Sequence, residues 1–154
     1  MKLKQWYFNT IFIFALNFLH SPLYAKEVYT SADPQNVQQV KRGKEIYLRF
    51  CSLCHGENLQ GQSNWRKRKS NGRLPAPPHD ETGHTWHHAD DLLFGIIKFG
   101  LIPPYAPKDY ESDMPAWGST LKDSDIWAVL AYIKSRWPKK TQNTQAKINR
   151  DSQQ

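Results

Sequence analysis

The chain of 154 residues lacks features that would assign it to several common structural classes. A membrane-spanning helix needs about 20 apolar residues, but the longest apolar stretch, Ile11–Leu19, is short and interrupted by Asn17. No internal repeat is present, and no segment shows the alternation of apolar and polar residues that indicates a β-strand. Cysteine is scarce, with only Cys51 and Cys54. The chemistry available to this close pair is the main question that the sequence raises.

Residues 1–25 have the layout of a secretory signal peptide. Lys2 and Lys4 precede the apolar run, Pro22 follows it, and the small residue Ala25 suits a cleavage site. We therefore expect a periplasmic protein, anchored to the membrane only if the segment stays uncleaved. The remaining chain is long enough for one small domain. In an oxidising compartment its two thiols would not stay free.

A first helix is predicted to begin with Asp33 as the cap and Pro34 in the first turn. Apolar and small residues then recur every three or four positions, which places them on one helix face. The members of this face are Val40, Gly43, Tyr47, Phe50, Cys51 and Cys54. The cysteines are therefore expected at the end of the helix, on its buried side.

Two further helices are predicted nearer the C-terminus. One runs from about Ala89 to Phe99 and is ended by Gly100. The other opens at Asp123 and is stopped by Pro138. Its apolar face comprises Ile126, Val129, Leu130, Ile133 and Trp137. The tail 139–154 is polar throughout and is predicted to be disordered.

Two long segments without helical periodicity separate these helices, at about 56–88 and 101–122. Loops longer than about 12–15 residues are uncommon in compact domains and are usually functional. Three short helices with two such loops bury little apolar surface alone. A large apolar cofactor, with the loops wrapped around it, would supply the missing core.

The stretch CSLCH allows three interpretations of Cys51, Cys54 and His55. A thioredoxin-like dithiol would need strand–helix–strand context, which is missing. A zinc site could combine the cysteines with His84 and His88, but the intervening loop is about twice the ~12–15 residues expected, and His55 would have no role. C-x-x-C-H is also the attachment signature of c-type haem, in which both thiols bond the haem and the histidine binds iron.

A methionine could bind the iron from the opposite side. Met114 is the only methionine outside the predicted signal peptide, and it lies in a polar loop before Pro115. Methionine usually fills gaps in a core, but this loop is not a core position. Ligation by histidine and methionine raises the haem potential into the range of electron carriers.

Taken together, these motifs resemble a class I, mitochondrial-type monohaem cytochrome c over Asp33 to Pro138. The segments that carry the resemblance are Gly43 and Tyr47 in the first helix, CSLCHG, SDMPAWG and DIWAVLAYIKSRWP. The resemblance implies an all-α cytochrome c fold, with about three main helices and long loops wrapped around one covalent haem c. Tyr132 would pack against the first helix near Gly43.

This resemblance also implies one-electron transfer between redox proteins, with no small-molecule substrate and no catalytic residues. A proline carbonyl would accept the N–H of His55, and the candidates are Pro75, Pro77 and Pro78. The first functional hypothesis is thus an exported electron carrier. The alternatives are a permanently bound haem subunit of a larger oxidoreductase, and a haem enzyme or sensor with an open iron site.

Two polar clusters lie in the longer loop. The basic cluster Arg66, Lys67, Arg68, Lys69 and Arg73 is either a solvated loop or a docking patch for an acidic redox partner. Nucleic acid is not an expected partner of an exported protein without base-stacking architecture. The histidines His79, His84, His87 and His88 are most simply polar loop residues, although they could bind copper or zinc, or replace Met114 at the iron.

Overall fold

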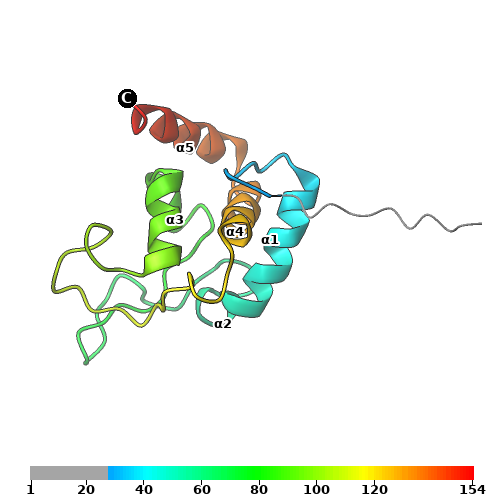
Figure 1. The fold of residues 1–154 in the computed structure, drawn as a ribbon. Coiled ribbons are helices and arrows are strands. Elements are labelled where there is room, and N and C mark those ends of the chain that lie inside the picture. Colours follow the sequence, from blue (N-terminus) through cyan, green and yellow to red (C-terminus); the bar gives the residue numbers. More distant parts are fainter. Residues whose placement is uncertain (1–27) are drawn as a thin grey trace, which may run out of the picture.

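The computed structural model describes residues 28–154, and the predicted signal peptide 1–25 lies outside this range (Figure 1). The described residues contain helices and no strands, which confirms the all-α class. The helices are α1 (Val37–Phe50), α2 (Ser52–His55), the 3-10 helix η1 (Thr85–His87), α3 (Asp90–Phe99), α4 (Asp123–Ser135) and α5 (Lys139–Asp151). The three predicted helices correspond to α1, α3 and α4, whereas α2 and α5 are additional.

Helix α1 begins later than predicted, because Asn36 and not Asp33 caps it. The Asn36 side chain accepts a hydrogen bond from the amide of Gln39 at 2.9 Å. Asp33 instead accepts from the amide of Gln35 and shapes the turn before the helix. At its other end α1 stops at Phe50, and the next turn of helix is the separate α2.

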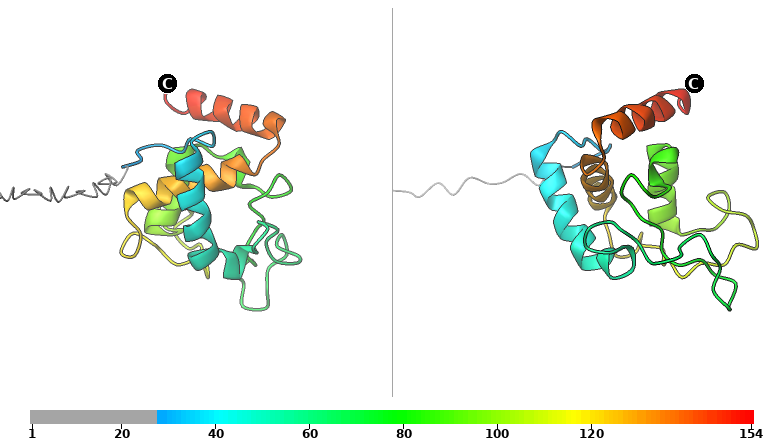
Figure 2. Two further views of the ribbon diagram at one scale, coloured as in Figure 1. Left: turned by 90° about the vertical axis from the view of Figure 1, so that its right-hand side faces the viewer. Right: turned by 180° about the vertical axis from the view of Figure 1, so that it is seen from behind.

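Helices α1 and α4 cross at close range and form the centre of the molecule (Figure 2). Gly43 permits this approach, because a methyl group at this position would overlap the carbonyl oxygen of Ala128. The rings of Tyr47 and Tyr132 pack beside it, with their centroids 5.4 Å apart. The predicted packing of Tyr132 near Gly43 is therefore confirmed.

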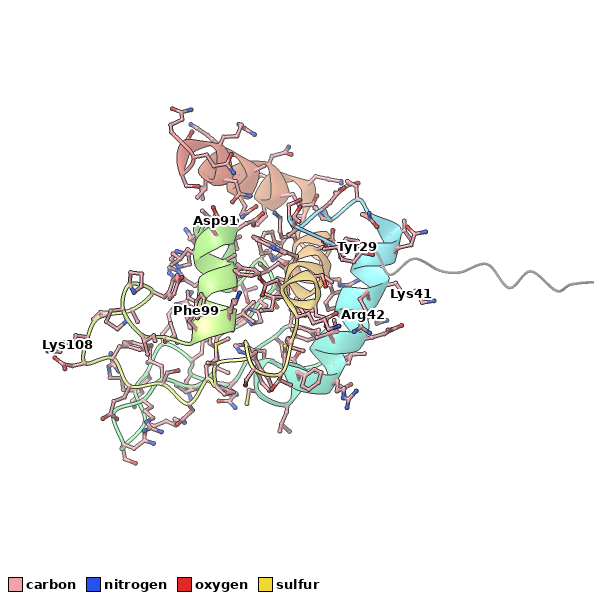
Figure 3. All side chains as sticks on the ribbon, in the orientation of Figure 1. Tyr29, Lys41, Arg42, Asp91, Phe99 and Lys108 are labelled. Atoms are coloured by element: carbon pink, nitrogen blue, oxygen red, sulfur yellow. The ribbon has the colours of Figure 1, made fainter. Side chains whose placement is uncertain are left out.

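Helix α4 is buried on nearly every side. The predicted apolar face is buried throughout, and Ala128, Ala131 and Tyr132 are buried as well. The polar residues of α4 that enter the interior are paired. Asp125 accepts from the guanidinium of Arg42 on α1 at 3.0 and 3.1 Å, and Lys134 donates to Asp90 on α3 at 2.5 Å. Figure 3 shows Arg42 on α1 beside this central helix.

The prediction that the tail 139–154 is disordered is wrong, because residues 139–151 form α5. Helix α5 lies across the N-terminal end of α3 (Figure 1). Gln145 is fully buried and donates to Asp90 Oδ1 at 2.7 Å and to the carbonyl of His88 at 3.2 Å. Asn149 accepts from the amide of Asp90 at 2.7 Å. A polar helix can therefore dock through hydrogen bonds, which its composition did not reveal.

Loop 101–122 leaves the other end of α3, whereas loop 56–88 runs from α2 to the N-terminal end of α3. Figure 3 places Asp91 near α5, Phe99 at the opposite end of α3, and Lys108 at the outer edge of the loops. None of the helices in residues 28–154 is long and apolar enough to cross a membrane. The helices form a frame, and the loops 56–88 and 101–122 extend from it.

Candidate haem attachment site

The two cysteines and His55 lie within one helical turn. The amide of His55 donates to the carbonyl of Cys51 at 2.9 Å, and the amide of Cys54 donates to the same carbonyl at 3.2 Å. Cys51 is partly buried, whereas Cys54 is exposed, so the prediction that both lie on the buried side is wrong for Cys54. The short helix α2 turns Cys54 away from the face of α1.

The imidazole of His55 is buried, and its orientation is fixed by a backbone carbonyl. Its Nδ1–H donates to the carbonyl oxygen of Pro77 at 2.8 Å. Of Pro75, Pro77 and Pro78, Pro77 thus makes the expected contact. Burial lowers the pKa of His55 and the bond to Pro77 opposes this shift, so the ring is neutral at pH 7. With its proton on Nδ1, the ring keeps a free lone pair on Nε2 for a metal.

Gly61 brings the proline segment close to His55, a role that sequence reasoning missed. Its amide donates to the carbonyl of His55 at 2.7 Å. Its φ of 66° lies in the left-handed region, and a Cβ atom here would lie 2.6 Å from the carbonyl carbon of Pro77. The only signal in the sequence was a single glycine within LQGQ, six residues after His55.

Tyr47 ties α1 to the same turn. Its ring is fully buried, and its hydroxyl donates to the carbonyl of Gly56 at 2.8 Å. Burial, followed by the nearby charge of Cys51, raises the pKa of the Tyr47 hydroxyl well above its ordinary value. The phenol therefore remains a neutral hydrogen-bond donor, and the chain after His55 is held against the core.

The thiol of Cys51 is also unlike that of a reactive dithiol. Burial, with a smaller contribution from Cys54, raises the pKa of Cys51 to about 12. Nucleophilic cysteines of redox enzymes have lowered pKa values, because the thiolate is the reactive species. With no strand among residues 28–154, the thioredoxin-like interpretation has no structural support.

His79 stacks on His55, with ring centroids 4.0 Å apart and an interplanar angle of 24°. Its Nδ1 is within 2.7 Å of the Thr85 hydroxyl oxygen. Burial, followed by the charge of His55, lowers the pKa of His79 well below its usual value. His79 therefore lies beside His55 rather than across an iron position from it, which argues against its replacing Met114.

The other three histidines gather around η1. The ring of His84 has its centroid 5.1 Å from that of His87 and 4.7 Å from that of His88. Within the described range, however, no three histidine, cysteine or acidic side chains are arranged to hold a metal ion. The zinc site combining the cysteines with His84 and His88 is therefore wrong, and a second metal at these histidines has no support.

The methionine loop is anchored next to the cysteine pair. The amide of Trp117 donates to the carbonyl of Ile97 at 2.9 Å, and its ring contacts that of Phe50 with centroids 5.4 Å apart. Phe50 directly precedes Cys51. Met114 lies three residues before Trp117 and is partly buried. Its role as an iron ligand stays a prediction.

The basic cluster is only partly free. Asp113 accepts from Lys69 through one carboxylate oxygen and from Arg73 through the other, both at 2.6 Å. These hydrogen bonds, that from Lys69 first, hold the pKa of the Asp113 carboxyl below its usual range. Arg73 also reaches Glu111 at 3.5 Å. Lys69 and Arg73 already have partners within the molecule. Both interpretations of the cluster, as a solvated loop and as a docking patch, therefore apply only to its other members.

The arrangement fits a covalently attached haem. The cysteine pair offers two thiols, and His55 offers an oriented nitrogen lone pair in the same turn. Three large apolar side chains are strongly exposed in or beside the site and the loops, namely Leu53 (94 %), Phe99 (46 %) and Ile102 (54 %). Leu53 lies between the two cysteines, so an apolar side chain is exposed in the attachment turn itself.

Comparisons with known proteins agree with this chemistry. The family model described as cytochrome C oxidase, cbb3-type, subunit III matches residues 38–133. Thiosulfate dehydrogenase from Stutzerimonas stutzeri (strain A1501) is 30 % identical over 106 residues, which cover 66 % of this chain. The chain spans only 29 % of the length of that relative. No solved structure matches the chain.

Proposed function

Because the chain belongs to the cytochrome c oxidase, cbb3-type, subunit III family, a family of c-type cytochrome domains that carry covalent haem c, we propose that it is an exported monohaem cytochrome. It carries single electrons between redox proteins and acts on no small-molecule substrate itself. Cys51 and Cys54 form the two thioether bonds, which use both cysteines and so allow one haem. Bound haem supplies a one-electron couple between ferric and ferrous iron.

The observation that carries the proposal is the bond from His55 to Pro77. It fixes the ring orientation and leaves Nε2 available, as expected of a histidine that ligates a metal. The low accessibility of His55 (7 % exposed) also keeps water from its Nδ1 proton. The chain thus presents an oriented ligand beside the two thiols that would anchor the haem.

Met114 is the proposed second iron ligand. Contact between Trp117 and Phe50 brings its loop against the residue before Cys51. Among the other candidates, His79 is stacked on His55, and His84, His87 and His88 lie together around η1. A thioether in this position would exclude exogenous ligands and favour electron transfer over chemistry at an open iron.

Acid–organic extraction of the protein, produced together with haem-attachment machinery, tests the covalent link. The wild type should retain its colour on the polypeptide, whereas Cys51→Ser with Cys54→Ser should release it into the solvent. Extraction of colour from the wild type would contradict the proposal. For Met114, the oxidised wild type should show the weak long-wavelength iron–thioether band, and Met114→Ala should lack it and bind imidazole more tightly.

A permanently bound subunit is the second candidate. The matched family is described as a subunit, and the thiosulfate dehydrogenase relative is much longer than this chain. This candidate predicts that the protein, isolated from its native membranes and periplasm, elutes in a large complex. A carrier would elute as a small protein, no larger than the 18.0 kDa of the full chain.

An acidic redox partner remains part of the carrier proposal. Lys67 and Arg68 are exposed and form no ion pair in the described range, unlike Lys69 and Arg73. If they dock a partner, the electron-transfer rate should fall as ionic strength rises, because charges are screened beyond about 8 Å at physiological salt. Lys67→Gln with Arg68→Gln should flatten this dependence, and an unchanged slope would exclude the patch.

A further inference from the structure

The loop that carries Met114 has little apolar packing of its own. Of residues 107–116, only Tyr110, Ser112 and Met114 are even partly buried. The bonds within this segment are local, such as that from the Met114 amide to the Ser112 hydroxyl at 3.0 Å. A loop of this kind does not fix the position of a side chain by burial. Something else must hold it if the thioether is to stay at one place.

On its C-terminal side the loop is tied to α3. The amides of Trp117 and Gly118 donate to the carbonyls of Ile97 and Lys98, both at 2.9 Å. These are backbone bonds, and side-chain substitutions leave them in place. They begin three residues after Met114, so the segment before the methionine needs a separate attachment.

That attachment is the basic turn 69–73. The amide of Lys69 donates to the carbonyl of Arg73 at 2.9 Å, which brings the two cations to the same side of a tight turn. Both then donate to Asp113, each to a different oxygen at 2.6 Å. Arg68 is braced by a 2.6 Å bond to the Gly72 carbonyl, and its guanidinium lies 5.8 Å from the centre of the Tyr110 ring.

The contact is electrostatic rather than a packed interface. An open cavity of about 520 Å³ lies between the two segments, lined by Arg68, Gly72 and residues 107–111. Among the described residues, Lys69, Arg73 and Arg68 make all the polar and ring contacts that join 107–116 to a distant part of the chain. Asp113 directly precedes Met114, so these contacts hold the chain one residue away from the methionine.

We infer that Lys69 and Arg73 are positioning residues, which hold the Met114 loop through Asp113 and so stabilise the bond between the Met114 thioether and the iron. The inference rests on the proposed ligation by Met114. It gives two residues of the basic cluster a role inside the molecule. We call the contacts of Lys69 and Arg73 with Asp113 the clamp. Loss of the clamp should let the methionine leave the iron more often, and an exogenous ligand should bind in its place.

Imidazole titration of the oxidised holoprotein tests the clamp. Asp113→Asn, and Lys69→Gln with Arg73→Gln, should each raise the affinity for imidazole roughly threefold, as expected for the loss of exposed ion pairs. Each should also weaken the long-wavelength iron–thioether band. The variant carrying all three substitutions should show no further change, because both sides of the clamp act through the same bonds. Asp113→Glu should restore part of the wild-type behaviour.

Two control variants distinguish the effect of losing the clamp contacts from the effect of changing the net charge of the loop or cluster. Asp109→Asn removes a carboxylate from the same loop, and Lys67→Gln removes a cation from the same cluster. Neither side chain forms an ion pair in the described part of the chain. Both controls should leave the imidazole affinity and the band unchanged. Equal effects of Asp109→Asn and Asp113→Asn, or additive effects of the clamp substitutions, would overturn the inference.

The same measurements distinguish a failure of the proposed Met114 ligation from a failure of the clamp. If the wild type lacks the band and Met114→Ala does not alter imidazole binding, the proposed ligation and the clamp's role at the iron are both wrong. If Met114→Ala abolishes the band but the clamp variants keep it, only the inference about Lys69 and Arg73 is wrong. Amide hydrogen exchange of residues 111–116 should be faster in Asp113→Asn than in the wild type, but unchanged in Asp109→Asn. The same difference should be seen when Met114→Ala is also present, because the clamp holds the loop with or without the thioether.

Discussion

The α1–α4 crossing and the two long loops are stabilised by different interactions. At the crossing, apolar side chains are buried on both helices, and the backbones meet at Gly43. In the loops, single hydrogen bonds and ion pairs determine the positions of the chemically important groups, such as Pro77 on His55 and Lys69 on Asp113. The frame is therefore robust to the loss of any one polar contact, whereas each loop position depends on one or two of them.

The largest effect is expected from Gly43→Ala. Its methyl group would overlap the backbone of Ala128 in α4, and a backbone atom cannot move aside as a side chain can. We expect the free energy of unfolding to fall by about 3 kcal/mol. Chemical denaturation followed by circular dichroism measures this.

Lys44→Ala, on the exposed side of α1, is the control and should change the stability by no more than about 0.5 kcal/mol. If the Gly43→Ala protein is as stable as the wild type, the α1–α4 crossing can accommodate a methyl group, and the proposed overlap with Ala128 is wrong.

A smaller effect, and a local one, is expected from Gly61→Ala. Alanine disfavours the φ of 66° at this position, which costs about 2 kcal/mol, and its Cβ would press on Pro77. The carbonyl of Pro77 should withdraw from His55. The helical circular dichroism signal should persist, while the haem spectrum and potential change. A changed helix content with an unchanged potential would contradict the division between frame and loops.

The smallest effect concerns the histidines around η1. Burial, followed by neighbouring charges, lowers the pKa values of His84 and His88. Protons therefore bind more tightly to these histidines in the unfolded chain, and the stabilising contribution is present above about pH 6.5 and lost as the pH falls below it. Unfolding measured between pH 5 and 8 should show this decline, and His84→Gln with His88→Gln should reduce its slope. An unchanged slope would assign the decline to groups other than these two histidines.

Sequence reasoning succeeded where burial decides the outcome. The apolar face of α4 followed from periodicity, because such a face has to be covered, and the end of α3 followed from Gly100. It also selected the helical turn with Cys51, Cys54 and His55. The start of α1 was misplaced by several residues, since Asp33 and Asn36 are both suitable caps and tertiary contacts decide between them.

Sequence reasoning could not predict the polar contacts between residues that are far apart in the chain. Nothing in the tail 139–154 indicates that Gln145 finds partners in His88 and Asp90, because these depend on the packing of α3 against α4. The choice of Pro77 among three prolines depended on Gly61 in the same way. The partners of Lys69 and Arg73 lie some 40 positions away, and a run of like charges reveals no partner.

The position of α5 has a consequence for how the protein can be studied on a surface. The C-terminus lies at the end of α5, and α5 crosses the N-terminal end of α3, opposite the end from which loop 101–122 leaves (Figure 1). A tether joined after residue 154 would hold each molecule with loop 101–122, which carries Met114, turned toward the solution. On an electrode, the Met114 loop of each immobilised molecule would then face soluble redox proteins rather than the metal surface. Current should then depend on an added partner more strongly than current from molecules adsorbed at random.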